Sequence, residues 1–83
     1  MLKDYEWEFC LALHKKLKEK IKGKVHTTVK DDVLIVSILM GKVEFKTEFD
    51  NFGTRVSEGC TTDMIVYDVY NSYKKYILDL YFM

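Results

Sequence analysis

The chain has 83 residues, of which 48% are hydrophobic and 14% aromatic, and its 13 basic and 13 acidic side chains leave no net charge. This length predicts a single domain, residues 1–83. Zero net charge disfavours a general nucleic-acid binder, which carries a basic excess. Two cysteines are too few for a disulfide scaffold, and no apolar run approaches the roughly 20 residues that span a bilayer. We therefore expect a cytoplasmic protein without membrane contact.

Residues 3–22 have the periodicity of an amphipathic helix. At about 100° per residue, one stripe of this helix collects apolar side chains and the opposite side collects charged ones. The stripe comprises Leu2, Phe9, Cys10, Leu13, Leu17 and Ile21. Gly23 is suited to end this helix. Lysines occupy its last turns, where cations interact favourably with the negative end of the helix dipole. Trp7 and Leu11 lie on the flank of the stripe and are the apolar residues that a core explains least.

Residues 24–49 predict three short strands. The first, KVHTTV, and the third, KVEFKTEF, alternate apolar and polar side chains, which is typical of half-buried antiparallel strands. The second, VLIVSIL, is apolar on both faces, as a central strand is. Polar residues at 30–32 and the pair Met40-Gly41 provide the two turns.

Residues 63–82 predict a long second helix with a broad apolar arc. The arc is wider than the roughly 100° that a surface helix needs. Thr61 or Thr62 is the expected N-cap, and Asp63 favours the first turn. The width of the arc predicts either packing on two sides or contact with a partner, including a second copy of this chain.

The segment 50–61 is less regular than its neighbours. Phe52 and Val56 stand four residues apart, which predicts an optional short helix that Gly59 ends. The predicted order is therefore helix, three-stranded antiparallel meander, short helix and long C-terminal helix. This is an α+β fold, and the simplest packing puts both long helices on one face of the sheet.

Six lysines crowd the segment LHKKLKEKIKGKVH. Residues 1–24 carry seven lysines against four acids, whereas 31–63 carry three basic residues against seven acids, so we expect an electrically lopsided molecule. Lys15, Lys18 and Lys22 point outward on the helix and are the candidate contacts to nucleic-acid phosphates. The preferred interpretation is a solvated helix end, because no arginine is present to clamp a phosphate with two hydrogen bonds.

The predicted element order is also that of the double-stranded RNA-binding domain. That family holds phosphates with a lysine-rich start to its last helix. Here the corresponding position reads EGCTTDMIVYD, with Glu58, Asp63 and Asp68 and no lysine before Lys74. The main phosphate anchor is absent, so nucleic-acid binding remains the less favoured alternative.

Cys10 and His14 have a spacing that suits one metal ion, with His26 and Cys60 as further ligands. Structural zinc sites usually contain two close-spaced pairs, and this chain has one, so we predict no metal site. No nucleophile motif surrounds a serine or cysteine, and no glycine-rich phosphate loop is present. We expect a protein that is not an enzyme and that uses no cofactor.

The best binding candidates are aromatic side chains on the flanks of the two long helices. Tyrosine and tryptophan are favoured at interfaces because they combine large area with a polar tip. The alternative is that these residues cover the edges of a small core. The interface candidates are Trp7, Leu11, Tyr67, Tyr70, Lys74 and Tyr81.

Three segments, DYEWEFCLALHKKLKEKIKGKV, VLIVSI and YNSYKKYILDLYF, resemble small uncharacterised proteins of bacteriophages and prophages of low-GC Gram-positive bacteria. The resemblance covers most of the chain and carries no functional residues. Such proteins often bind host machinery, and some resemble anti-CRISPR or other anti-defence inhibitors. The resemblance implies a non-enzymatic protein that binds a host or defence protein in the host cytoplasm. The alternatives are a nucleic-acid-binding module and a protein that sequesters a small ligand in a tyrosine-lined pocket.

Overall fold

The computed structural model describes the chain from residue 4 to residue 81, and side chains to residue 80. Its elements are α1 (Asp4–Lys20), β1 (Lys24–Lys30), β2 (Val33–Met40), β3 (Val43–Phe49), α2 (Phe52–Ser57) and α3 (Thr62–Tyr81). This order confirms the predicted α+β fold, including the short helix. Leu2 and the side chain of Tyr81 lie outside the described part, so their predicted roles stay predictions.

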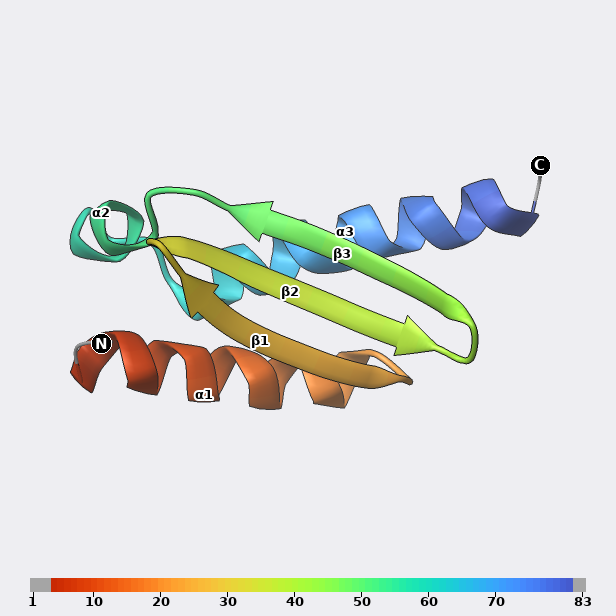
Figure 1. Cartoon of the computed structure of the whole chain (residues 1–83), viewed down its shortest axis with the longest axis horizontal. Coiled ribbons are helices and arrows are strands. Elements are labelled where there is room, and N and C mark those ends of the chain that lie inside the picture. Colours follow the sequence, from red (N-terminus) through yellow and green to blue (C-terminus); the bar gives the residue numbers. More distant parts are fainter. Residues whose placement is uncertain (1–3, 82–83) are drawn as a thin grey trace.

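The three strands form an antiparallel meander in the order β1-β2-β3, and both long helices pack on one face of it (Figure 1). Alternation along the strands explains why. Val25, Ile38 and Phe45 are register partners across the sheet, point to the same face and are buried. Their neighbours in sequence point to the other face, where Lys24 and Glu44 are exposed. One face is therefore apolar enough to hold two helices.

The core lies between the sheet and the two long helices. α3 contributes the buried residues of its first two turns, and α1 contributes its predicted stripe. Buried hydrophobic residues are Cys10, Leu13, Leu17, Ile21, Val25, Leu34, Val36, Ile38, Phe45, Phe52, Ile65, Val66 and Val69. The second half of α3 packs through two tyrosines against Phe45, and Figure 1 shows its last turns extending past the sheet.

α1 ends at Lys20, two residues before the predicted end. The next residues turn the chain into β1 beside the end of β2. Gly23 has a φ of 151°, and a Cβ at this position would lie 2.9 Å from the carbonyl oxygen of Leu39. Only glycine fits this approach, so Lys22 lies in the connection and not on the helix.

α3 begins with the predicted cap. The hydroxyl of Thr61 accepts a hydrogen bond from the backbone N–H of Met64 at 3.3 Å. Lys16 of α1 donates to the hydroxyl of Thr62 at 2.7 Å and to the Asp63 carboxylate at 2.8 Å. These bonds hold the start of α3 against the second half of α1.

α2 closes the end of the core at which α3 starts. The ring of Phe52 is buried and meets the ring of Phe9 edge to face, with centroids 5.4 Å apart. Asp32, in the β1–β2 turn, accepts the backbone N–H of Phe52 on its carbonyl at 2.9 Å and that of Gly53 on its side chain at 2.8 Å. The turn that the sequence predicted from polar residues is therefore also the attachment point of α2.

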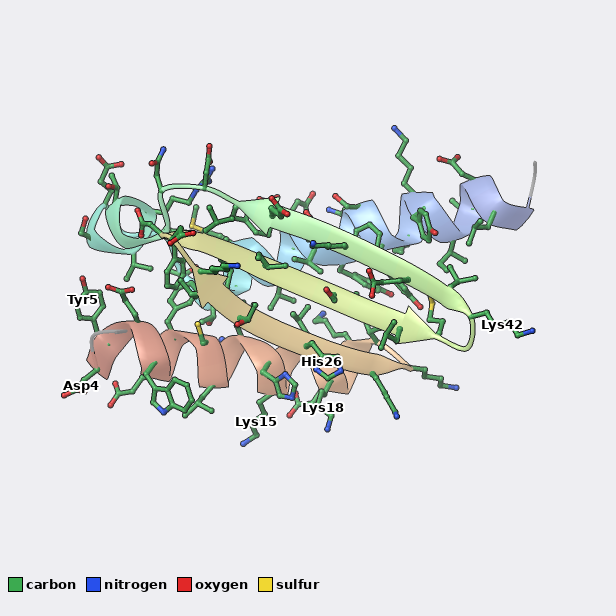
Figure 2. All side chains as sticks on the ribbon, viewed as in Figure 1. Asp4, Tyr5, Lys15, Lys18, His26 and Lys42 are labelled. Carbon is green, nitrogen blue, oxygen red and sulfur yellow. The ribbon has the colours of Figure 1, made fainter. Side chains whose placement is uncertain are left out.

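Charge is distributed along the long axis of the molecule, whose extents are 40 × 22 × 19 Å. The elements meeting at one end carry mainly acids, and those meeting at the other carry mainly lysines (Figures 1 and 2). The acidic end holds Asp4, Asp31, Asp32, Asp50, Glu58 and Asp63 beside Lys30 and Arg55, and the basic end holds Lys18, Lys20, Lys22, Lys24, Lys42 and Lys74 beside Glu19 and Glu44. Within residues 4–81, neither long helix has the apolar run needed to cross a membrane.

Candidate functional site

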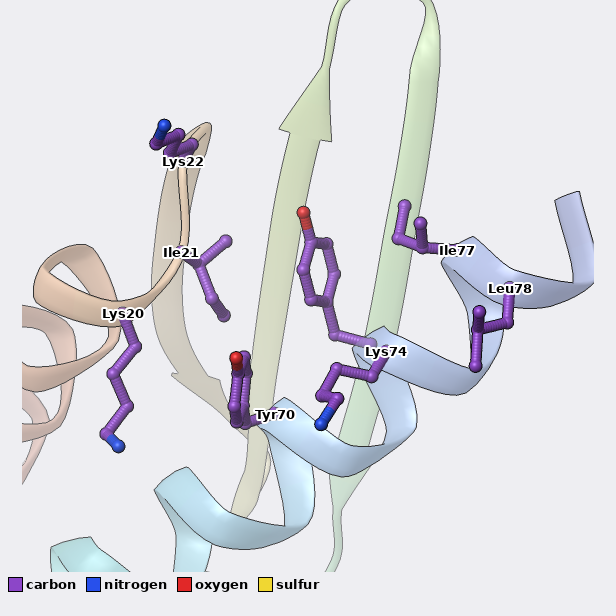
Figure 3. A pocket seen from close by; sticks show the side chains of 8 residues that line it. Lys20, Ile21, Lys22, Tyr70, Lys74, Ile77 and Leu78 are labelled. Carbon is purple, nitrogen blue, oxygen red and sulfur yellow. The ribbon is translucent and has the colours of Figure 1, made fainter. Parts of the chain in front are cut away.

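A groove opens between the end of α1 and the second half of α3. Figure 1 shows the two helices separating toward the end at which α1 stops, and Figure 3 shows the side chains that line the opening. The groove has a volume of about 410 Å³. Its lining residues are Lys20, Ile21, Lys22, Tyr70, Tyr73, Lys74, Ile77 and Leu78.

The floor of the groove is apolar. Ile21 is buried directly after the last residue of α1, and Tyr73 and Ile77 are half-buried on successive turns of α3. The hydroxyl of Tyr73 donates to the sulfur of Met40 at 3.0 Å, which fixes the ring against the sheet. Leu78 extends the apolar surface outward and is 54% exposed. The groove therefore offers apolar contact area on a supported base.

Tyr70 stands at the centre of the groove between two lysines (Figure 3). The Nζ atom of Lys20 lies 5.6 Å from the ring centroid, and that of Lys74 lies 5.3 Å from it. Both distances allow cation–π attraction, which contributes about 0.5–1 kcal/mol at exposed sites. The two ammonium groups are thus held on either side of one ring, although each lysine is exposed.

The rim of the groove is basic. Lys22 joins Lys20 and Lys74, and no aspartate or glutamate is among the lining residues. A carboxylate 4 Å from an ammonium in water gains about 1 kcal/mol from each pair. An apolar floor under several cations favours a ligand that combines an aromatic or aliphatic group with a negative charge.

The structure brings together three residues that the sequence assigned to two different functions. Tyr70 and Lys74 were predicted as protein-interface residues, and Lys22 as a phosphate contact; all three line the groove. Two other interface candidates, Trp7 and Leu11, lie outside it and are 57% and 54% exposed on α1.

Tyr67 also lies outside the groove. It is 69% exposed and lines a shallow hollow with Asp63, Met64 and Asp68. This part of α3 is therefore acidic and apolar, whereas the groove farther along the same helix is basic and apolar. The interface residues predicted on the last helix belong to at least two different surfaces.

The three lysines predicted to bind nucleic acid do not line one site. Lys15 and Lys18 are exposed side by side on α1 (Figure 2), and Lys18 lines a second hollow with residues of β1. Lys22 faces the groove instead, because α1 has already ended. The split weakens the case for a single phosphate-binding surface on this segment.

Sequence reasoning missed most of the groove. Ile21 was assigned to the apolar stripe of the first helix, and Lys20, Tyr73 and Ile77 were not among the candidate site residues. The i, i+4 spacing of Tyr70 and Lys74 indicates their contact, since residues four apart are neighbours on a helix. Nothing in the sequence indicates that Lys20 approaches the same ring from another element.

The four candidate metal ligands do not assemble. His14 and His26 line the same hollow, with Lys18 and Lys24 beside them. Among residues 4–80, no three His, Cys, Asp or Glu side chains are grouped closely enough to hold a metal ion. Both cysteines are free; burial, and secondarily the charge of Glu6, raises the pKa of the Cys10 thiol. A buried thiol with a raised pKa is a poor nucleophile.

Comparison with protein-family models, curated proteins and solved structures found no match for this chain. Its function must therefore be argued from the chemistry of the groove and of the surfaces beside it.

Proposed function

We propose that this protein is a small non-catalytic binding protein that holds an acidic, partly apolar segment of a partner protein in the groove between α1 and α3. The observation that carries the proposal is the position of Tyr70, which lies between Lys20 and Lys74 over an apolar floor with no acid among the lining residues. Concave sites with an apolar base and a few convergent polar groups are the usual places where proteins bind ligands.

The apolar floor and the basic rim of the groove would bind different parts of the partner. An aliphatic or aromatic side chain of the partner would cover the floor formed by Tyr73 and Ile77, and burying one such side chain contributes about 1.5–3 kcal/mol. Carboxylates on either side of it would meet the lysines on the rim. Ordering the partner opposes both gains, so the groove on its own suits a moderate affinity.

The charge distribution supports the same type of partner. The basic end of the molecule attracts an acidic surface before contact, and the acidic end turns away from it. The resemblance to small phage and prophage proteins makes a bacterial host protein, or a component of host defence, the expected partner. Binding there would act by occupying a surface, and no catalytic step is part of the proposal.

The proposal is tested by fluorescence anisotropy with a labelled synthetic peptide in which glutamates flank leucine and phenylalanine. Lys74→Glu and Lys20→Glu each reverse one charge on the rim and should weaken binding about 3- to 30-fold, since an exposed pair contributes roughly 0.2–1 kcal/mol and reversal replaces attraction by repulsion. Tyr70→Ala should also weaken binding, because it removes the ring that positions both lysines.

The matched control is Lys15→Glu, which makes the same change in net charge on an exposed residue of α1 outside the groove. Its affinity should stay close to that of the wild type. Equal weakening by all three reversals would show attraction by net charge alone and would contradict the groove. Tight binding of duplex DNA or RNA, lost steeply with salt and with Lys15→Glu, would instead favour the nucleic-acid alternative.

A further inference from the structure

α3 has a second stripe that faces solvent. Met64, Tyr67 and Leu78 are 55%, 69% and 54% exposed, so three large side chains of this helix face solvent. Together with Asn71 and Lys74 they follow one another at alternating steps of three and four residues. This spacing is that of a coiled-coil seam, in which a helix meets another helix along one line.

The stripe is distinct from the broad apolar arc that the sequence offered for self-association. The first part of that arc is used inside the domain, where Ile65, Val66 and Val69 are buried. The exposed stripe lies on the opposite side of the helix, at about 100° per residue. Among residues 4–80, no other element packs on this stripe, because the sheet and the other helices contact the buried side of α3.

The charges beside the stripe change sign along the helix. Asp68 precedes its midpoint and Lys75 follows it, both are exposed, and both lie on the same edge of the stripe seven residues apart. If two copies of α3 ran antiparallel, Asp68 of each copy would approach Lys75 of the other. A parallel pair would instead place Asp68 against Asp68 and Lys75 against Lys75, which is unfavourable.

We infer that α3 binds a second copy of this chain in an antiparallel, two-fold symmetric dimer. The antiparallel arrangement brings Tyr67 of each copy against Leu78 of the other, so two exposed side chains of the stripe cover one another. Asn71 lies close to the symmetry axis, and a polar residue within a seam fixes register at some cost in stability. Each contact occurs twice because the interface is isologous.

The contact area is limited by the length of the stripe. From residue 64 to residue 78 the helix rises about 21 Å, which is shorter than most stable coiled coils. The dimer is therefore expected as a concentration-dependent equilibrium with the monomer. Lys74 and Leu78 belong both to the stripe and to the rim of the groove, whereas Asp68 and Lys75 lie outside the groove. Changes at these last two positions consequently test the dimer without altering the proposed binding site.

Sedimentation velocity of the full chain over a range of concentrations at low salt tests the inference. Asp68→Lys and Lys75→Asp each replace two attractive pairs by two repulsive ones, and each should raise the dissociation constant of the dimer by roughly tenfold or more. An equimolar mixture of the two variants, and the double variant Asp68→Lys/Lys75→Asp, should both recover the dimer to within about threefold, since each restores opposite charges.

The control is Lys15→Glu, a charge reversal at an exposed residue of α1 away from the stripe, and it should leave dimerisation unchanged. Far-UV circular dichroism confirms that each variant is folded. A wild-type chain that stays monomeric at every concentration would overturn the inference. So would single variants whose weakening is not recovered by mixing, because the antiparallel pairing of Asp68 with Lys75 requires that recovery.

Discussion

Replacing Phe52 by alanine should remove a large part of the stability of the fold. Phe52 is 1% exposed, and its ring meets Phe9 edge to face beneath the attachment of α2. Truncation of a fully buried phenylalanine costs about 3–5 kcal/mol, from lost transfer free energy and from the cavity left behind. A chain of 83 residues is stabilised by roughly 4–12 kcal/mol in total. The substitution therefore removes at least a quarter of that stability.

Urea unfolding followed by circular dichroism measures this loss. The variant should unfold at a lower urea concentration with an unchanged slope, which reports lower stability without a change in the surface exposed. The comparison variant is Leu11→Ala, which also truncates a large apolar side chain. Because Leu11 is 54% exposed, this substitution should change the free energy of unfolding by no more than about 0.5 kcal/mol. If Phe52→Ala cost less than about 1 kcal/mol, the core would not extend under α2.

Two further substitutions test local features. Asp32→Asn keeps an acceptor for the N–H of Gly53 and tolerates the φ of 61°, so it should be nearly neutral, whereas Asp32→Ala should cost about 1–2 kcal/mol in urea unfolding. Burial raises the pKa of the Cys10 thiol in the folded chain, so as pH rises the thiol ionises in the unfolded chain before it does in the folded one. The free energy of unfolding is therefore unaffected by this thiol below about pH 8.5 and falls as pH rises above that value. Between pH 7 and pH 10 the wild type should therefore lose more stability than Cys10→Ala, and equal losses would contradict this.

The order and type of the elements could be predicted because several local signals agree. Strict alternation in β3, the helical stripe of α1 and the threonine before α3 each require only neighbouring residues. The early end of α1 could not be predicted. It depends on the close approach of Gly23 to the carbonyl of Leu39, which is distant in sequence.

The candidate site was harder to predict from the sequence for the same reason. Tyr70 and Lys74 share one helix, so their sequence spacing predicts that they are neighbours. Lys20 reaches Tyr70 from α1, and this depends on how far the two helices separate after the contacts of Lys16. A sequence pattern shows which side of a helix is apolar, but the crossing of two helices is set by the packing of side chains from both.

Chemical-shift mapping by NMR, with the acidic leucine- and phenylalanine-containing peptide added to the isotopically labelled chain, tests the groove most directly. Shifts should concentrate at Lys20, Ile21, Tyr70, Lys74 and Ile77 and should be lost in Tyr70→Ala. Shifts centred on Trp7 and Leu11, or no shifts at low salt, would contradict binding in the groove between α1 and α3.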